Sequence, residues 1–257
     1  MAKVKELVAG SDPLVLEFAI DVLADSPSEE AVALLKGLLD RPDPMVRFLA
    51  AVALRKHGDW SGVLLMAYEL GSSKDVATRR CAAGYLEQAG RFAAPTLVRA
   101  LADPAWQVRS NALDSLSEVA DASVATRIRE VMRGDDNWAV RAAAARALYK
   151  LTQSDEASES LLTESLKHLP SQSAMERQTA AMLLTDAAKM GRTEALSRLV
   201  ELLSDSSRGV RRFAIDGLCQ FSQSSLGYDC QLDPKQQQES IGRWRSWLQE
   251  RAPRNGP

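Results

Sequence analysis

Histidine and cysteine are the side chains with which this sequence could bind a metal or form a catalytic nucleophile. His57 and His168 are far apart, whereas a helical zinc-protease site needs two histidines one turn apart. The three cysteines, Cys81, Cys219 and Cys230, are an odd number without CxxC spacing. These residues predict free, inert thiols in a reducing cytoplasm and no metal site.

The adjacent carboxylates Asp135 and Asp136 could also bind a metal ion. They precede a segment with helical periodicity, where an acidic side chain caps the free N–H groups of the helix. The sequence has no Gly-rich phosphate loop, GxSxG turn, zinc spacing or calcium loop. We therefore predict a protein without catalytic residues and without a cofactor.

An arginine that recurs along the chain is the remaining feature with chemical potential, because a basic ladder could bind phosphates. It occurs at Arg47, Arg79, Arg109, Arg141, Arg177 and Arg211. Its return at one place in each of six similar segments favours a role within the repeat rather than in binding one ligand.

The segments that contain these arginines share a helical pattern. With the arginine as position zero, and Leu16 as the zero of a weaker first copy, alanine stands at +3 and leucine at +7 in every copy. The alanines are Ala19, Ala50, Ala82, Ala112, Ala144, Ala180 and Ala214, and the leucines are Leu23, Leu54, Leu86, Leu116, Leu148, Leu184 and Leu218. This spacing places both on one stripe of a helix, and the distance of 30 to 36 residues between copies is typical of a helical solenoid.

Caps and turn residues divide the chain into predicted helices. They cover residues 1–9, 13–24, 29–39, 44–57, 60–70, 74–88, 92–101, 106–120, 124–133, 138–151, 157–169, 174–190, 193–204, 209–221 and 236–251. Residues 222–235 read as an ordered loop. The last helix carries Trp244 and Trp247 on one face and is predicted to cover the apolar end of the repeats.

The segment Ala94-Pro95-Thr96-Leu97-Val98-Arg99-Ala100-Leu101-Ala102-Asp103-Pro104, followed by Val108-Arg109 and Ala112-Leu113, resembles a HEAT repeat. It is similar to the short bacterial type also found in phycobilisome lyases. The resemblance implies an all-α, right-handed α-solenoid of about seven helical hairpins with a C-terminal capping helix. We expect repeats over residues 1–221, with residues 222–257 forming the loop and capping helix of the same domain.

The resemblance also implies that each recurrent guanidinium bonds carbonyls or an aspartate in a neighbouring turn. The aspartates close enough in sequence are Asp43, Asp75, Asp103 and Asp136.

In such proteins the second helix of each hairpin lines a concave face that meets a partner. We therefore predict a non-catalytic scaffold whose concave face binds a protein or peptide. The predicted partner-binding residues are Phe48, Arg55, Arg80, Trp106, Asp114, Trp138, Arg146, Tyr149, Met182 and Arg212. Trp106 and Trp138 stand three residues before zero and form either an exposed aromatic pair or packed staples, whereas Trp60 is predicted to pack.

Two other functions remain open, namely nucleic-acid binding and a bilin lyase or chromophore-handling subunit. A nucleic-acid partner is disfavoured because Glu87 and Asp114 interrupt the basic residues of the concave face, and because the formal charge is −2 with a pI of about 5.8. The lyase function has only the repeat subtype as support. The pattern does not specify an oligomeric state.

Charge and hydropathy also predict where the protein resides. No segment approaches the roughly 20 apolar residues that span a bilayer, and the first residues lack the apolar core of a signal peptide. We therefore predict a cytoplasmic protein without membrane contact.

Residues 1–40 hold three basic and eight acidic side chains, so this end of the chain has a net charge of −5.

Overall fold

The computed structural model describes residues 2–251, and every regular element in this range is helical. The predicted all-α class is thereby confirmed. Residues 252–257, which belong to the predicted C-terminal segment, lie outside the described range. The α-helices are Ala2–Ala9 (α1), Pro13–Ala24 (α2), Glu29–Leu38 (α3), Pro44–Lys56 (α4), Ser61–Ser72 (α5), Val76–Tyr85 (α6), Ala94–Ala100 (α7), Trp106–Val119 (α8), Ala125–Gly134 (α9), Trp138–Thr152 (α10), Asp155–His168 (α11), Ala174–Lys189 (α12), Glu194–Leu202 (α13), Arg208–Ser222 (α14) and Gln238–Arg251 (α15).

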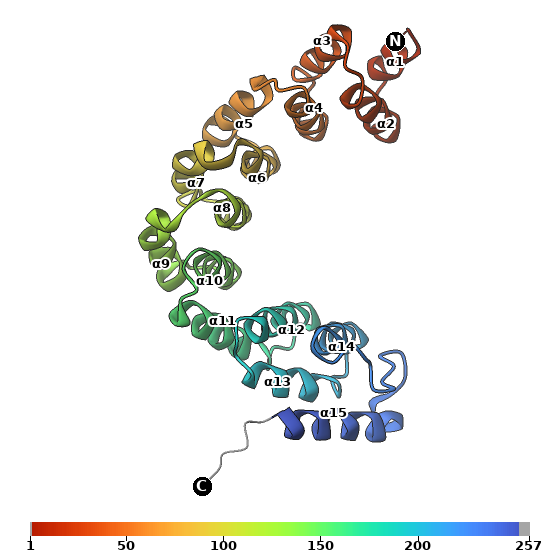
Figure 1. Ribbon diagram of the computed structural model, residues 1–257, viewed down its shortest axis with the longest axis vertical. Helices are drawn as coiled ribbons and strands as arrows, with labels where there is room; N and C mark the ends of the chain where they lie inside the picture. The colour runs from red at the N-terminus through yellow and green to blue at the C-terminus, as the bar shows by residue number, and fades with distance from the viewer. Residues whose placement is uncertain (1, 252–257) are drawn as a thin grey trace. The chain divides into compact units, whose positions relative to one another are not determined.

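The chain divides into two compact units, residues 1–131 and residues 132–257. In the first unit α2, α4, α6 and α8 pack successively in one row, and α5 and α7 belong to a second row beside it (Figure 1). In the second unit α11 packs on α10 and α12, and α13 packs on α12, α14 and α15. Each unit is thus a stack of antiparallel helical hairpins, as an α-solenoid requires. The assignment of the whole chain to one domain stays a prediction.

The stripe of alanine and leucine forms the core of both units. All seven alanines at +3 are 0% exposed, and all seven leucines at +7 are at most 1% exposed. A methyl group at +3 lets neighbouring helices approach closely, while the branched leucine fills the layer between them. The predicted helical stripe is therefore confirmed.

Acidic and hydroxyl side chains begin several of the second helices. Asp12 accepts hydrogen bonds from the N–H groups of Leu14 and Val15, at 3.0 and 3.4 Å, and Pro13 occupies the first helical position. Asp43 caps α4 and Asp75 caps α6 in the same way. These caps explain why helix starts are well predicted from the sequence.

The segment between α6 and α7 differs from the prediction of a helix over 74–88. The α-helix ends at Tyr85 and continues as a 3-10 helix, Leu86–Ala93 (η1). Gly90 has φ of 60° within this segment, a left-handed conformation that glycine adopts without steric cost and that ends regular helix.

The C-terminal loop and α15 close the second unit. Trp244 is fully buried, donates its indole N–H to the carbonyl of Ser225 at 3.1 Å, and meets the ring of Trp247 edge-on at 5.3 Å. In the loop, Tyr228 is buried and donates to the carbonyl of Leu203. The loop is therefore ordered, and Trp244 covers the apolar end as predicted.

Candidate functional site

The recurrent arginines at position zero bind the turn that precedes their own helix. In all six copies Nη1 donates to the carbonyls six and five residues upstream, at 2.7 to 3.3 Å. These turns have carbonyls that no helical N–H can reach, so the guanidinium satisfies them. The arginines thus serve the repeat, which leaves the hypothesis of a phosphate-binding ladder without support.

The other edge of the guanidinium binds a carboxylate of the following repeat. Arg79 donates from Nε and Nη2 to Asp103, at 2.7 and 3.0 Å, and Arg177 donates likewise to Asp205, at 2.8 and 2.9 Å. Both aspartates stand six residues before the next arginine. Each also accepts the N–H group two residues downstream, that of Ala105 or Ser207. One aspartate therefore joins two successive turns.

Where position −6 of the next repeat is not acidic, another partner replaces it. Glu69 lies 2.8 Å from Nε of Arg47, and Glu164 accepts from Nη2 of Arg141 at 2.8 Å. At the end of the repeats, Nη2 of Arg211 donates to two carbonyls of the C-terminal loop. Of the aspartates proposed from sequence proximity, Asp103 has the predicted role.

Two other aspartates proposed as partners, Asp43 and Asp75, have a different role in the turns. Asp43 and Asp75 cap helices, because they stand four rather than six residues before their arginines. The interpretation of these two as arginine partners is wrong.

Against the opposing effect of burial, the arginine partners lower the pKa values of Asp103 and Asp205. Burial alone would raise the pKa of Asp103, but the hydrogen bonds from Arg79 and from the N–H of Ala105 outweigh it and lower the pKa below its usual value. The pKa of Asp205 is lowered against the same opposing effect of burial by Arg177 and the N–H of Ser207. Both side chains therefore remain ionised in the folded protein at pH values where the unfolded chain takes up protons.

The difference between the folded and unfolded pKa values predicts that the stability of the protein depends on pH. An aspartate whose pKa is lowered on folding stabilises the fold fully above its unfolded pKa of about 3.9. That contribution is lost as the pH falls through the lower folded pKa. We expect the urea midpoint to fall more steeply below about pH 4 in the native protein than in the double variant Asp103→Asn/Asp205→Asn. The exposed Asp216→Asn is the control and should retain the native slope.

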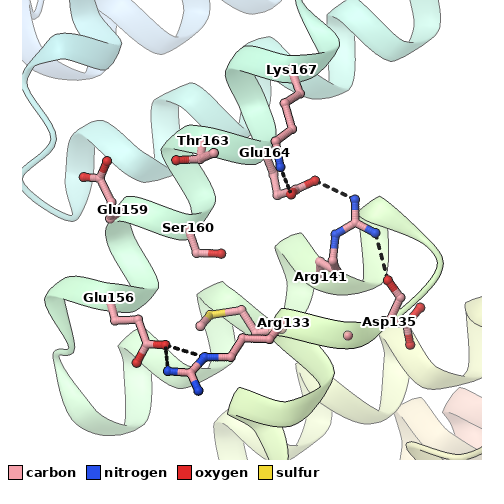
Figure 2. A pocket seen from close by; sticks show the side chains of 11 residues that line it. Arg133, Asp135, Arg141, Glu156, Glu159, Ser160, Thr163, Glu164 and Lys167 are labelled. Carbon is pink, nitrogen blue, oxygen red and sulfur yellow. Dashed lines mark hydrogen bonds and ion pairs between the residues drawn. The ribbon is translucent and has the colours of Figure 1, made fainter.

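A groove of about 510 Å³ lies in the second unit beside one of these turns. Figure 2 shows Arg141 between the carbonyl of Asp135 and the carboxylate of Glu164, which Lys167 also contacts. On the other side of the groove, Arg133 pairs with Glu156 at 2.5 Å. The charged side chains that line the groove pair with one another. The groove is therefore explained by the hydrogen bonds of the turn more than by the binding of a ligand.

The predicted partner surface of α4 is partly used in internal packing. Phe48 is half-buried and meets the ring of Tyr85 edge-on at 5.5 Å. The guanidinium of Arg55 lies 3.9 Å above the ring of Trp60. Trp60 is nevertheless 43% exposed, so it is less covered than the prediction of staple packing required.

Three other residues of the predicted surface in the first unit face solvent. Arg80 and Asp114 are exposed, and Trp106 is 42% exposed at the first position of α8. An exposed tryptophan is suited to contact with a protein.

The second unit presents a mixture of packed and accessible residues. Trp138 is half-buried and stacks on His168 with ring centroids 3.9 Å apart, so it packs as a staple. Arg146 lies 3.6 Å from Asp186 of α12, and Tyr149 is half-buried on the same helix as Arg146.

Met182 and Arg212 complete the predicted surface of the second unit, and both are exposed. Partner binding by all ten predicted residues stays a prediction.

An exposed apolar stripe on α2 was missed by the sequence interpretation. It consists of Leu14, Phe18 and Val22, spaced four residues apart. The sequence signal was present, since apolar side chains recur at positions −2, +2 and +6 of this helix, outside the core stripe.

The cysteines and acidic residues do not form a chemical site within the described residues. Cys81, Cys219 and Cys230 are half-buried free thiols, and burial followed by the nearby Asp216 raises the pKa of Cys219. Among residues 2–251, no group of three or more His, Cys, Asp or Glu side chains could hold a metal ion. No helix in that range has the length and apolar character needed to cross a bilayer.

Comparison with known proteins relates this architecture to others. The sequence model of a family described as HEAT repeats matches residues 2–83 and 94–174. A search of curated proteins gave no match. Among solved structures, the chain is similar to the complex of CpcE and CpcF of phycocyanin lyase from Nostoc sp. PCC7120, with 21% sequence identity and a TM-score of 0.53. The similarity covers 96% of this chain and 92% of that chain, and at this identity it shows the fold.

Proposed function

The chain belongs to the HEAT-repeat family, and on that premise we propose that it is a non-catalytic scaffold that binds a protein or peptide partner on the surface of its second helices. The observation that carries this proposal is that the second helices use one set of side chains inside the turns and leave another set exposed. The arginines at position zero are used inside the turns, whereas Arg80, Trp106, Met182 and Arg212 remain accessible on second helices.

Aromatic, methionine and arginine side chains are enriched in protein interfaces, and they are mixed here with acidic residues such as Asp114. A surface of mixed charge suits a peptide better than a phosphate backbone. Because the helices that carry it are packed in rigid hairpins, little ordering is required when the partner arrives. The similar solved chain belongs to a complex of two proteins, which also supports a protein partner.

Arg146 and Tyr149 provide the test of this surface. A partner captured by affinity purification and mapped by cross-linking should bind Arg146→Glu and Tyr149→Ala about tenfold or more weakly than the native protein, as expected for hot-spot residues. The helical circular-dichroism signal should not change. Unchanged affinity in both variants would remove the second-helix surface from the proposal.

Matched controls lie on first helices. Tyr68→Ala replaces an exposed tyrosine of α5, and Arg127→Glu replaces an exposed arginine of α9. Neither should affect the captured partner. Weakening by these controls equal to that of Arg146→Glu and Tyr149→Ala would place the partner elsewhere.

A chromophore-handling subunit is the second candidate. The likeness to the phycocyanin lyase complex shows a shared fold and no shared activity. The chromophore-handling function is therefore supported by the repeat subtype alone. Co-expression with a phycobiliprotein decides it, because attached pigment that requires this chain would favour the second candidate over a plain scaffold.

A further inference from the structure

The helix α2 exposes a continuous apolar stripe at the amino end of the first unit. Leu14, Phe18 and Val22 are 78%, 63% and 39% exposed. A spacing of four residues places them on one face of the helix. Such a stripe is unusual on a helix that no further repeat covers within residues 2–251, because the outer faces of solenoid end repeats normally present polar residues to water.

One residue of the stripe, Val22, occupies the position with which later second helices pack on their predecessors. Val22 stands at +6, and the +6 residues of the other second helices are all buried. They are Ala53, Tyr85, Ser115, Ala147, Leu183 and Gly217. The hydroxyl of Tyr85 donates to the carbonyl of Ala51 at 2.7 Å, and that of Ser115 donates to the carbonyl of Ala83 at 2.9 Å.

Position +6 therefore faces the preceding second helix. In Figure 1, α2 is the first of the row α2, α4, α6 and α8, so nothing in the described residues takes the place of a predecessor. A partner helix placed beside α2, as α4 is placed beside α6, would contact Val22 in the same way that buried +6 residues contact their predecessors.

Acidic side chains border the stripe. Glu17 and Asp21, at +1 and +5, are exposed and have no ion pair within residues 2–251. Asp25 is also exposed, and its nearest cation is the exposed Lys56 at 3.5 Å. The net charge of −5 over residues 1–40 adds to the local negative potential.

We propose that this stripe, defined by Leu14, Phe18 and Val22, docks a basic amphipathic α-helix of a partner protein. The apolar residues supply the buried contact, and Glu17 and Asp21 pair with lysine or arginine at the edge of the docked helix. The α2 helix of a second copy is disfavoured as the occupant, because face-to-face docking would bring the acidic borders of two α2 helices together. The surface is separate from the one tested with Arg146 and Tyr149, so either can fail without the other.

The chain itself supplies a suitable probe. A free peptide of residues 138–152 has three basic and no acidic side chains. Ala142 and Ala145 stand at +1 and +4, the positions of Arg80 and Ala83, whose carbonyls accept hydrogen bonds from the following second helix. Its charge-reversed counterpart carries glutamate in place of Arg141, Arg146 and Lys150. Fluorescence anisotropy of the labelled peptides, titrated with the full-length protein, should show binding of the basic peptide that weakens with salt. Circular dichroism checks that both peptides have comparable helix content.

Two kinds of variant locate the binding. Phe18→Ser changes an exposed side chain and should weaken binding of the basic peptide about tenfold or more, as loss of a hot-spot aromatic does. Phe92→Ser, which replaces a 78% exposed phenylalanine of η1, is the matched control and should bind normally. Glu17→Lys/Asp21→Lys should weaken the basic peptide and strengthen the charge-reversed one, whereas Glu130→Lys should do neither.

The proposal is overturned if the basic peptide does not bind at millimolar concentration, or binds Phe18→Ser as well as native protein. Equal binding of both peptides would also overturn it, since charge would then not select the occupant. Sedimentation that shows a dimer of the native chain, lost in Phe18→Ser, would assign the stripe to a second copy instead.

Discussion

Replacement of Asp205 with alanine is expected to lower the free energy of unfolding by about 3–5 kcal/mol, the range for breaking a buried ion pair. Asp205 accepts two hydrogen bonds from Arg177, and the side chains are 10% and 14% exposed. The variant leaves a buried guanidinium without its counter-charge and also removes the acceptor of the Ser207 N–H. Urea denaturation followed by circular dichroism measures the loss.

Asp216→Ala is the matched control in the same repeat. Asp216 lies 3.6 Å from Arg212, but these side chains are 63% and 71% exposed. Exposed pairs contribute about 0–1 kcal/mol, so the control should unfold almost as the native protein does. If Asp205→Ala were as stable as Asp216→Ala, the link between successive turns would contribute little to the fold. Asp205→Asn, which retains the shape and can still accept a hydrogen bond, should lie between the two.

Replacement of Trp244 with alanine is expected to cost about 3–5 kcal/mol, as for other buried tryptophans. The side chain is fully buried, and its indole N–H is satisfied by the carbonyl of Ser225. Truncation would leave a large cavity beneath α15 and an unpaired carbonyl in the C-terminal loop. Trp106→Ala, at an exposed tryptophan, should cost much less.

The loss in Trp244→Ala should also be local. In a solenoid each hairpin contacts its neighbours alone, so loss of a cap weakens the nearest repeats first. Hydrogen exchange should show faster exchange in α13 and α15, which pack on each other, with α5 and α6 unchanged. Uniform acceleration through both units would contradict this and indicate that the chain unfolds as one cooperative body.

The repeat pattern made most of the fold predictable. An alanine at +3 and a leucine at +7 are sterically required where hairpins stack, so their spacing identifies the second helix of each hairpin from the sequence. Caps such as Asp12 fixed the helix starts to within a few residues. The 3-10 segment around Gly90 was missed because periodicity does not reveal the backbone conformation of a single glycine.

The candidate site was less predictable, because exposure depends on neighbours that a sequence does not place. Trp106 and Trp138 share one position in the repeat, yet one is exposed and the other stacks on His168. That histidine lies 30 residues beyond Trp138, and no local pattern indicates that it covers the ring. The acidic partners of the recurrent arginines were likewise obscured, since Arg79 and Arg177 bind an aspartate of the next turn, whereas Arg47 binds a glutamate within a helix.

The stripe on α2 shows a further reason why surface sites are hard to predict from the sequence. Leu14 and Phe18 fall outside the core stripe, but their apolar character alone does not indicate whether a neighbouring helix covers them. Their exposure follows from the place of α2 as the first second helix, which only the arrangement of the hairpins reveals.

The two-sided bonding of the arginine has a consequence for how such chains change length. A repeat that contains arginine at zero and aspartate at −6 brings an acceptor for the arginine of its predecessor and a guanidinium that satisfies its own turn, as the segment from Asp103 to Arg109 does. The same chemistry recurs at Asp205 and Arg211, far away in the chain. Any two hairpins of this kind can form the same arginine–aspartate contact. Duplication or deletion of one whole hairpin would therefore leave the contacts between neighbouring repeats unchanged.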